Sequence, residues 1–272
     1  MSRSGAAVNA RTESFARSAA VGFYNDGMIL NTAAYQFVSI LDPDVLAAQL
    51  RGWAEAGALR GTALVAPEGI NLFLAGAEEP VNAFFAELRN DPRFAGLRVK
   101  YSDSARQPFA RLKVKVKPEI ISFRRDNASP LAGRAPSVDP AMLAQWLRQG
   151  HDDAGRRVLL LDTRNRQEVE YGTFSGALSL PIDRFTDLPA AVEAHREQLA
   201  DATVVSFCTG GIRCEKAALW MQDAGMDNVL QLQGGILGYF EEVGGQGYDG
   251  HCFVFDERVA VDAQLKPLVD AA

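Results

Sequence analysis

The stretch that decides the fold is residues 204–221, with the sequence VVSFCTGGIRCEKAALWM. Its β-branched and aromatic start is typical of a buried strand, which ends at Cys208 and is followed by a loop that contains Gly210 and Gly211. A helical pattern begins near Cys214. The sequence therefore predicts a strand, a short loop and a helix, in that order.

The predicted loop is suited to an anion. The backbone N–H groups of a glycine-containing loop point inward, the positive end of the helix dipole lies beneath them, and Arg213 adds a fixed positive charge. We therefore expect Cys208 to be a thiolate near neutral pH. The alternative is a small buried hydrophobic residue at a strand end, which the neighbouring glycines and arginine argue against.

Two classes of protein are similar to this strand, loop and helix: the rhodanese-type sulfurtransferases and the cysteine phosphatases that share their fold. Phosphatases place their arginine six positions after the cysteine, in a loop wide enough for a phosphate. Here Arg213 is five positions after Cys208, and the sixth position is Cys214. The shorter loop favours a persulfide sulfur over a phosphate.

Composition indicates a chain long enough for two domains. It has 272 residues, of which 47% are hydrophobic, and a formal net charge of −6. No segment reaches the roughly 18 uninterrupted apolar residues that a membrane span needs, and the N-terminus lacks an apolar signal core. Three cysteines without paired spacing indicate reduced thiols, so we expect a cytoplasmic protein that does not bind membranes.

Residues 1–30 mix Ser, Ala, Gly and Arg with little periodicity, and we expect a mobile tail there. A transit peptide is the alternative, but Glu13 and Asp26 count against it. A ferredoxin-like α+β domain is expected over residues 31–126. Its predicted strands are 34–40, 61–66, 70–74 and 97–101, and its predicted helices are 43–56 and 80–88.

Positive charge is concentrated at the end of this domain. Residues 93–125 carry ten lysines and arginines against two acidic residues, and Lys113, Lys115 and Lys117 alternate with apolar residues. This alternation puts one row of cations on one face of a strand. A basic strip on an acidic protein indicates a polyanionic partner, for which RNA is the best candidate. The alternative is an edge strand that its lysines guard against aggregation.

The second half of the chain predicts an α/β fold. Residues 127–138 form the expected linker, since prolines and a glycine interrupt any periodic pattern. Strands alternate with helices over residues 139–247, which indicates a parallel sheet with its site at the carboxyl ends of the strands. We expect residues 248–272 to form a C-terminal tail.

Several motifs together carry a specific resemblance. They are PEGIN at 67–71, DTRN at 162–165, CTGGIRCEKA at 208–217 and CFVFDERV at 252–259. With these motifs the chain resembles rhodanese domains and, more closely, the rhodanese-domain tRNA uridine hydroxylases, over about residues 34–262. The resemblance implies oxygen-dependent 5-hydroxylation of the wobble uridine of tRNA. Molecular oxygen is then a co-substrate, and the loop cysteine bears a persulfide by analogy with rhodaneses.

The resemblance implies roles for the loop residues. Cys208 is the nucleophile or persulfide carrier, and the backbone N–H groups of the residues that follow hold its terminal sulfur. Arg213 orients the loop or meets the substrate, and its alternative is a structural ion pair. The cradle is formed by Thr209, Gly210, Gly211 and Ile212.

Other candidate residues have supporting roles. Cys214 stands at the start of the helix, where a thiolate is favoured, and is a candidate resolving thiol, with packing as its alternative. Asp162 and Arg164 are expected to brace the loop. Too few cysteines and histidines exist for a convincing metal site, so we expect none. No cofactor can be identified, and the sequence does not explain the oxygen chemistry.

Three hypotheses result. In the first, the lysine strip binds the anticodon stem-loop of tRNA while the Cys208 pocket receives an extruded uridine. In the second, the chain is a thiosulfate or persulfide sulfurtransferase, which needs only the second domain. The third is a non-catalytic RNA-binding module, which Cys208 and Arg213 argue against. No protein partner can be identified.

Overall fold

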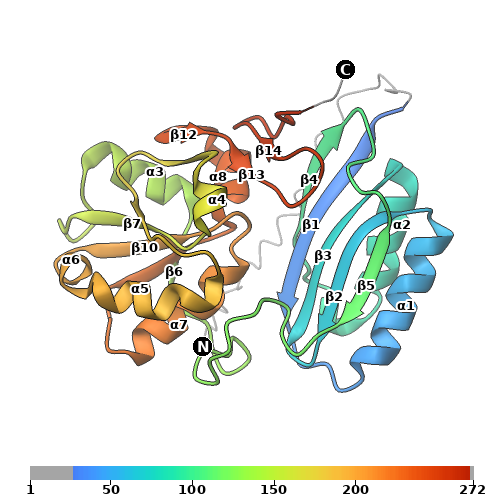
Figure 1. The fold of residues 1–272 in the computed structure, drawn as a ribbon, viewed down its shortest axis with the longest axis horizontal. Helices are drawn as coiled ribbons and strands as arrows, with labels where there is room; N and C mark the ends of the chain where they lie inside the picture. The colour runs from blue at the N-terminus through green and yellow to red at the C-terminus, as the bar shows by residue number, and fades with distance from the viewer. Residues whose placement is uncertain (1–26, 270–272) are drawn as a thin grey trace, which may run out of the picture.

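Figure 1 shows two domains side by side in the computed structural model, which describes residues 27–269. Each domain is built on its own five-stranded sheet. The last part of the chain folds back and lies close to both domains (Figure 1). Within residues 27–269, no helix is long and apolar enough to cross a membrane.

The first domain confirms the predicted order β-α-β-β-α-β. Its strands run in the order β4-β1-β3-β2-β5, and all pairs are antiparallel except β5 with β2. Strand β5 is thus a fifth strand added at one edge. The elements are β1 (Ile29–Phe37), α1 (Pro43–Ala56), β2 (Arg60–Ala66), β3 (Gly69–Gly76), α2 (Glu78–Arg89), β4 (Val99–Ser104) and β5 (Leu112–Val116).

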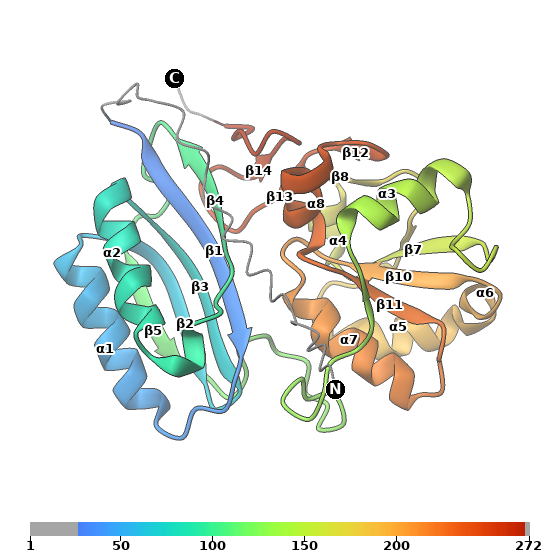
Figure 2. The ribbon, with the colours of Figure 1, turned by 180° about the vertical axis from the view of Figure 1, so that it is seen from behind.

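Helix α1 shows how local sequence builds this domain. It begins at Pro43, whose fixed φ suits a first helical turn. Leu46, Leu50 and Ala54 recur every four residues and are buried in the domain core. Helices α1 and α2 cover one face of the sheet, and Figure 2 shows the other face turned toward the second domain. The first sheet is therefore half of the interface between domains.

Strand β1 begins earlier than predicted. It starts at Ile29 rather than Ala34, because Leu30 packs into the core and the strand pairs with both β3 and β4 along this length. The tail predicted for residues 1–30 therefore ends too late. Residues 1–26 lie outside the described residues.

The second domain has the predicted parallel sheet, in the order β6-β11-β10-β7-β9. Asp139 caps its first helix by accepting a hydrogen bond from the N–H of Met142 at 2.8 Å. The elements are β6 (Ser137–Val138), α3 (Pro140–Gln149), β7 (Val158–Asp162), α4 (Arg166–Val169), β8 (Gly172–Phe174), β9 (Leu178–Ser179), α5 (Leu188–Ala194), α6 (Arg196–Ala200), β10 (Thr203–Phe207), α7 (Ile212–Asp223), β11 (Val229–Leu232) and α8 (Gly235–Val243).

The segment expected as a linker over 127–138 is part of the second domain. Ala128 and Ala135 are buried in its core, and β6 joins its sheet. Just before this segment, the ring of Phe123 stacks on that of Phe185 with a centroid separation of 4.6 Å. The connection is thus packed rather than free, because its few apolar residues fill gaps beside α7.

The C-terminal tail expected over 248–272 is also folded. Strand β12 (Tyr248–Gly250) pairs with β8, and β13 (Cys252–Phe253) pairs with β14 (Ala260–Val261). Cys252 and Val254 are buried in the core of the second domain. Strands of two or three residues are too short to give a periodic pattern, so the sequence did not reveal them. Residues 270–272 lie outside the described residues.

A buried lysine joins the two domains. The Nζ atom of Lys216, in α7, lies 2.8 Å from a carboxylate oxygen of Glu68 and 2.6 Å from one of Glu119. It also donates a hydrogen bond to the backbone oxygen of Ile121 at 3.2 Å. Only 4% of the Lys216 side chain is exposed. These contacts connect the helix that follows the Cys208 loop to the first domain.

Candidate active site

Cys208 lies at the carboxyl end of β10 and is 1% exposed. The N–H of Gly211 donates a hydrogen bond to its Sγ atom at 3.1 Å. Burial raises the pKa of Cys208, but a hydrogen bond from the Cys214 thiol, the charge of Arg213 and the backbone N–H groups of the loop together lower this pKa to about 6. The expected thiolate near neutral pH agrees with this direction.

Cys214 has a different state from the one predicted. Burial and the neighbouring Cys208 thiolate raise the pKa of Cys214 well above that of an ordinary thiol. Its Sγ atom lies 3.6 Å from the Oγ1 atom of Thr163, and the residue is fully buried. Cys214 is thus a neutral thiol that donates to Cys208, and the expectation of a second thiolate is wrong. Its role as a resolving thiol stays a prediction.

Arg213 is held by a buried carboxylate. Its Nη1 and Nη2 atoms donate to the two carboxylate oxygens of Glu168 at 2.7 and 2.6 Å. Burial lowers the pKa of Arg213, but the Glu168 carboxylate raises it above the ordinary value overall. The structural ion pair that the sequence left as an alternative is present. Arg213 also lines the cavity described below, so the pair fixes a cation beside Cys208.

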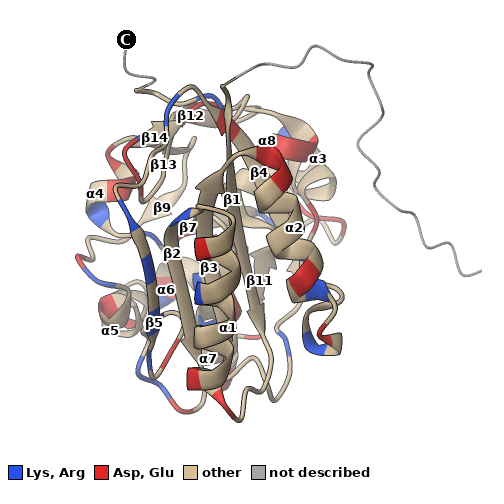
Figure 3. Cartoon of the chain, turned by 90° about the vertical axis from the view of Figure 1, so that its right-hand side faces the viewer, with Lys and Arg blue, Asp and Glu red and all other residues tan. Residues whose placement is uncertain are grey.

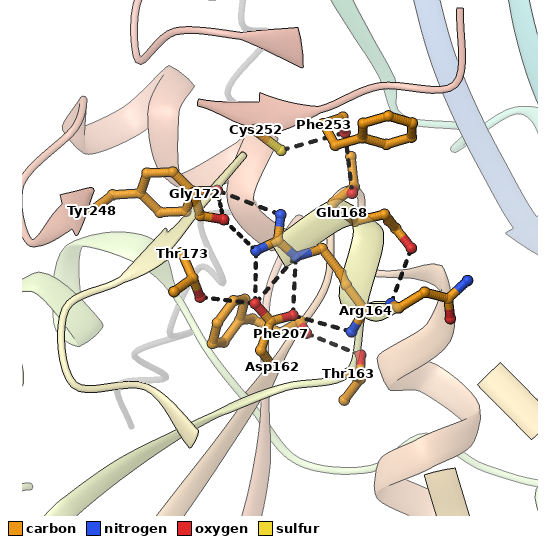
Figure 4. Close-up of polar contacts among 12 residues, drawn as sticks. Asp162, Thr163, Arg164, Glu168, Gly172, Thr173, Phe207, Tyr248, Cys252 and Phe253 are labelled. Atoms are coloured by element: carbon orange, nitrogen blue, oxygen red, sulfur yellow. Dashed lines mark hydrogen bonds and ion pairs between the residues drawn. The ribbon is translucent and has the colours of Figure 1, made fainter. Parts of the chain in front are cut away.

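A second buried ion pair, between Asp162 and Arg164, supports the ends of the central strands. Figure 4 shows the Arg164 guanidinium against the Asp162 carboxylate, with Nη2 to Oδ2 at 2.6 Å. The same Nη2 atom donates to the backbone oxygen of Gly172 at 2.7 Å, and Thr173 donates to Asp162 at 2.8 Å. Both charged side chains are fully buried. These contacts join the end of β7 to β8, and the role of the pair in bracing the Cys208 loop stays a prediction.

Helix α8 packs backbone to backbone beneath the loop. The N–H of Ile236 donates to the oxygen of Cys208 at 2.9 Å, and that of Leu237 donates to the oxygen of Thr209 at 3.0 Å. A Cβ atom on Gly235 would lie 2.5 Å from the Cys208 oxygen and 2.6 Å from the Gly211 nitrogen. Glycine is therefore required at position 235, where φ is +63°.

A cavity of about 530 Å³ lies between the loop and the first domain. Cys208 and Arg213 line it from the second domain, Asn71 and Phe73 from β3, and Phe255 from the C-terminal segment. The open face of the first sheet and the Cys208 loop thus enclose one space, and the cavity exists only because the two domains meet. A cavity of this size and mixed lining is suited to an organic ligand.

Two side chains of the first domain reach the loop directly. Lys100, on β4, donates from Nζ to the backbone oxygen of Gly210 at 3.1 Å. Tyr35, on β1, donates from its hydroxyl to a carboxylate oxygen of Glu215 at 3.3 Å. Burial lowers the pKa of Lys100 and raises that of Tyr35. Sequence reasoning missed both residues, since nothing local distinguishes them from other strand residues.

The lysine strip lies on the sheet face that lines the cavity. Lys113 of β5 lies opposite Thr62 of β2, and Thr62 lies opposite Phe73 of β3. The side chains of Lys113 and Phe73 therefore lie on the same face of the sheet, and Phe73 lines the cavity. Lys115 follows two residues later on the same face, and Lys117 itself lines the cavity. Lys113 and Lys115 are exposed, and Figure 3 shows the basic residues along β5. The structure therefore brings the strip to the edge of the cavity.

Known proteins match both domains. Residues 29–120 match the UPF0176 acylphosphatase like domain, and residues 143–242 match the rhodanese-like domain. The "tRNA uridine(34) hydroxylase" of Xanthomonas euvesicatoria pv. vesicatoria (strain 85-10) is 75% identical over 244 residues, which cover 90% of this chain and 98% of the relative. The chain belongs to the tRNA uridine(34) hydroxylase family. The protein of that name from Xylella fastidiosa (strain 9a5c) is 66% identical over 243 residues, which cover 89% of this chain and 95% of the relative.

Membership of this family confirms the resemblance drawn from the sequence motifs. It leaves the individual site residues as predictions. Within residues 27–269, no group of three or more His, Cys, Asp or Glu side chains is arranged to hold a metal ion.

Proposed function

We infer that this chain is an enzyme that hydroxylates the wobble uridine, uridine 34, of tRNA at C5 of the uracil ring. The observation that carries the proposal is the shared cavity, in which a Cys208 thiolate faces a sheet whose edge presents a row of lysines. Family membership supports the same reaction. A tRNA substrate supports the cytoplasmic location expected from the sequence.

The lysine strip binds the anticodon stem-loop in this proposal. Lys113, Lys115 and Lys117 contact backbone phosphates, which hold RNA without reading its sequence. The wobble uridine turns out of the loop and enters the cavity, because an enzyme that acts on a base needs access to its ring. The strip and Cys208 then contact one RNA at the same time.

Cys208 is the nucleophile. Its Sγ atom adds to C6 of uracil, and the electron pair of the C5–C6 double bond moves toward C5 and the O4 carbonyl. C5 takes up dioxygen and a proton as a hydroperoxide, which two molecules of a thiol reductant reduce to a hydroxyl group. One oxygen atom leaves as water, and the two thiols become a disulfide. Loss of the C5 proton and departure of the Cys208 thiolate then restore the double bond.

Nucleoside mass spectrometry tests the function. Unmodified tRNA is incubated in air with the purified protein and dithiothreitol, and uridine 34 should gain the mass of one oxygen atom. Cys208→Ser should abolish the product, and Cys252→Ser is the matched control because the Cys252 thiol is buried and its pKa is raised by burial to about 12. Absence of the product together with thiosulfate-to-cyanide transfer would favour the sulfurtransferase instead.

A modified RNA tests the nucleophilic step. With 5-fluorouridine at position 34 there is no C5 proton to lose, so the adduct between RNA and Cys208 should persist on a denaturing gel. Cys208→Ser should form no adduct. Hydroxylation of normal tRNA without any adduct on the fluorinated RNA would favour a persulfide role for Cys208.

A further inference from the structure

Phe255 is an exposed aromatic residue that directly follows a buried segment of the chain. The residue is 52% exposed, although Cys252 and Val254 just before it are buried in the core of the second domain. An exposed aromatic ring at the edge of a cavity is a feature of sites that bind flat ligands. Phe255 belongs to the motif CFVFDERV at 252–259, and no residue of this motif takes part in the proposed reaction steps.

The backbone on both sides of Phe255 is fixed. On one side, the N–H of Val254 donates to the oxygen of Val259 at 2.9 Å. On the other, Asp256 forms an ion pair with Arg258 at 2.6 Å, and Arg258 donates to Ser102 of β4 at 2.7 Å. The first domain therefore helps to hold the ring in place. A ring that is already ordered loses little conformational entropy when a ligand binds.

The ring lies over the catalytic loop. The Arg213 guanidinium is 5.9 Å from the centroid of the Phe255 ring. The ring of Phe253 lies nearly perpendicular to the Phe255 ring, and the two ring centroids are 5.1 Å apart. Phe255 lines the same cavity as Cys208, whereas Tyr171, the next exposed aromatic residue beside Phe253, does not line it. The open part of the Phe255 ring is thus available to a ligand in the cavity.

We propose that Phe255 is the stacking platform for the uracil ring of the target uridine, an inference that rests on the proposed function. Bases that leave an RNA stack are commonly held on aromatic side chains. Stacking on Phe255 holds the uracil ring inside the cavity, against the wall that Phe255 forms and near the loop that carries Cys208. Phe255 is thus a substrate-binding residue of the reaction, distinct from the lysines that hold phosphates.

A binding cycle tests the contact. The dissociation constant of an anticodon stem-loop RNA is measured, at one salt concentration, for the full-length protein and Phe255→Ala, with uridine or an abasic nucleotide at position 34. Phe255→Ala should weaken binding of the uridine RNA about tenfold or more. The abasic RNA should bind both proteins equally weakly, because the ring then has no base to contact. Equal loss on both RNAs would overturn the proposal.

Two controls separate the alternatives. Tyr171→Ala should show no such coupling to the base at position 34. An abasic nucleotide at position 35 should leave the effect of Phe255→Ala on binding unchanged. If this abasic RNA instead removes the effect, Phe255 contacts the base at position 35, and the proposal is overturned.

Phe255→Leu tests whether the aromatic ring itself is needed, because leucine keeps an apolar side chain. This variant should have an unchanged melting temperature and should still bind the uridine RNA weakly. A failed hydroxylation assay with intact coupling would refute the proposed function and leave the stacking contact standing.

Discussion

Glu168 and Arg213 form a buried bidentate ion pair, with N–O distances of 2.6 and 2.7 Å, directly beside the Cys208 loop. Glu168 also accepts a hydrogen bond from the backbone N–H of Asn165 at 3.1 Å. One carboxylate therefore fixes the start of α4 and the charge that lowers the pKa of Cys208. Stability and reactivity depend on the same pair.

Glu168→Gln should cost about 3 kcal/mol of unfolding free energy, because it leaves the Arg213 charge buried without compensation. Chemical denaturation measures this loss. The exposed neighbour Glu170→Gln is the matched control and should change stability by less than about 0.5 kcal/mol. Similar losses for the two variants would show that the ion pair contributes little.

Alkylation should occur first at Cys208. Its pKa of about 6 makes it mostly thiolate at pH 7, whereas burial raises the pKa values of Cys214 and Cys252. The rate of reaction with iodoacetamide should rise as pH increases through about 6, as followed by peptide mass spectrometry. Cys214→Ala removes a hydrogen bond that lowers the Cys208 pKa, so the profile should move to higher pH. An unmoved profile would mean that Cys214 does not donate to Cys208.

The same pKa shift has a consequence for stability. The folded-state pKa of Cys208 lies below that of an ordinary thiol, so its ionisation stabilises the fold fully above the unfolded-state pKa. This contribution declines as pH falls toward about 6. Cys208→Ser should remove this part of the pH dependence, which thermal melting across pH 6 to pH 9 would reveal as a flatter profile.

Replacing Lys113, Lys115 and Lys117 with Gln should weaken tRNA binding and reduce its salt dependence. Each lost phosphate contact lowers the slope of log affinity against log salt by about 0.7 to 0.9, so the triple variant should lose about 2. Arg89→Gln is the control, since Arg89 lies on α2 and the helices cover the opposite face of the sheet. Unchanged affinity and slope would remove the strip from the RNA-binding surface.

Lys216→Met should loosen the domain interface, because it leaves Glu68 and Glu119 without their cation. We expect a loss of about 2 kcal/mol in unfolding free energy at pH 7. Burial raises the pKa of Glu119, but hydrogen bonds from Lys216 and the backbone lower it overall. The wild type should therefore lose stability as pH falls through this depressed pKa, and the variant should lose less over the same range. Parallel pH profiles would contradict this coupling.

The sequence predicted those helices and strands whose residues show a clear local pattern of apolar spacing. Apolar spacing identified α1, and the run that ends at Cys208 identified β10 and its loop. The wall opposite Cys208 could not be predicted, since Lys100 and Phe255 reach the loop only through the packing of distant segments. The prediction that Cys214 is a thiolate was wrong because it considered only the helix dipole. Burial and the adjacent Cys208 thiolate dominate the pKa of Cys214 and raise it.

The close approach of Gly235 to the oxygen of Cys208 shows that two parts of the cavity are built differently. The floor under the thiolate is made of main-chain atoms, and a side chain at position 235 would collide with them. The opposite walls are side chains of another domain and of the C-terminal segment. Mutations in those walls can alter which molecule enters the cavity while the main-chain surroundings of Cys208 stay as they are. The fold thus lets selectivity evolve without rebuilding the reactive centre.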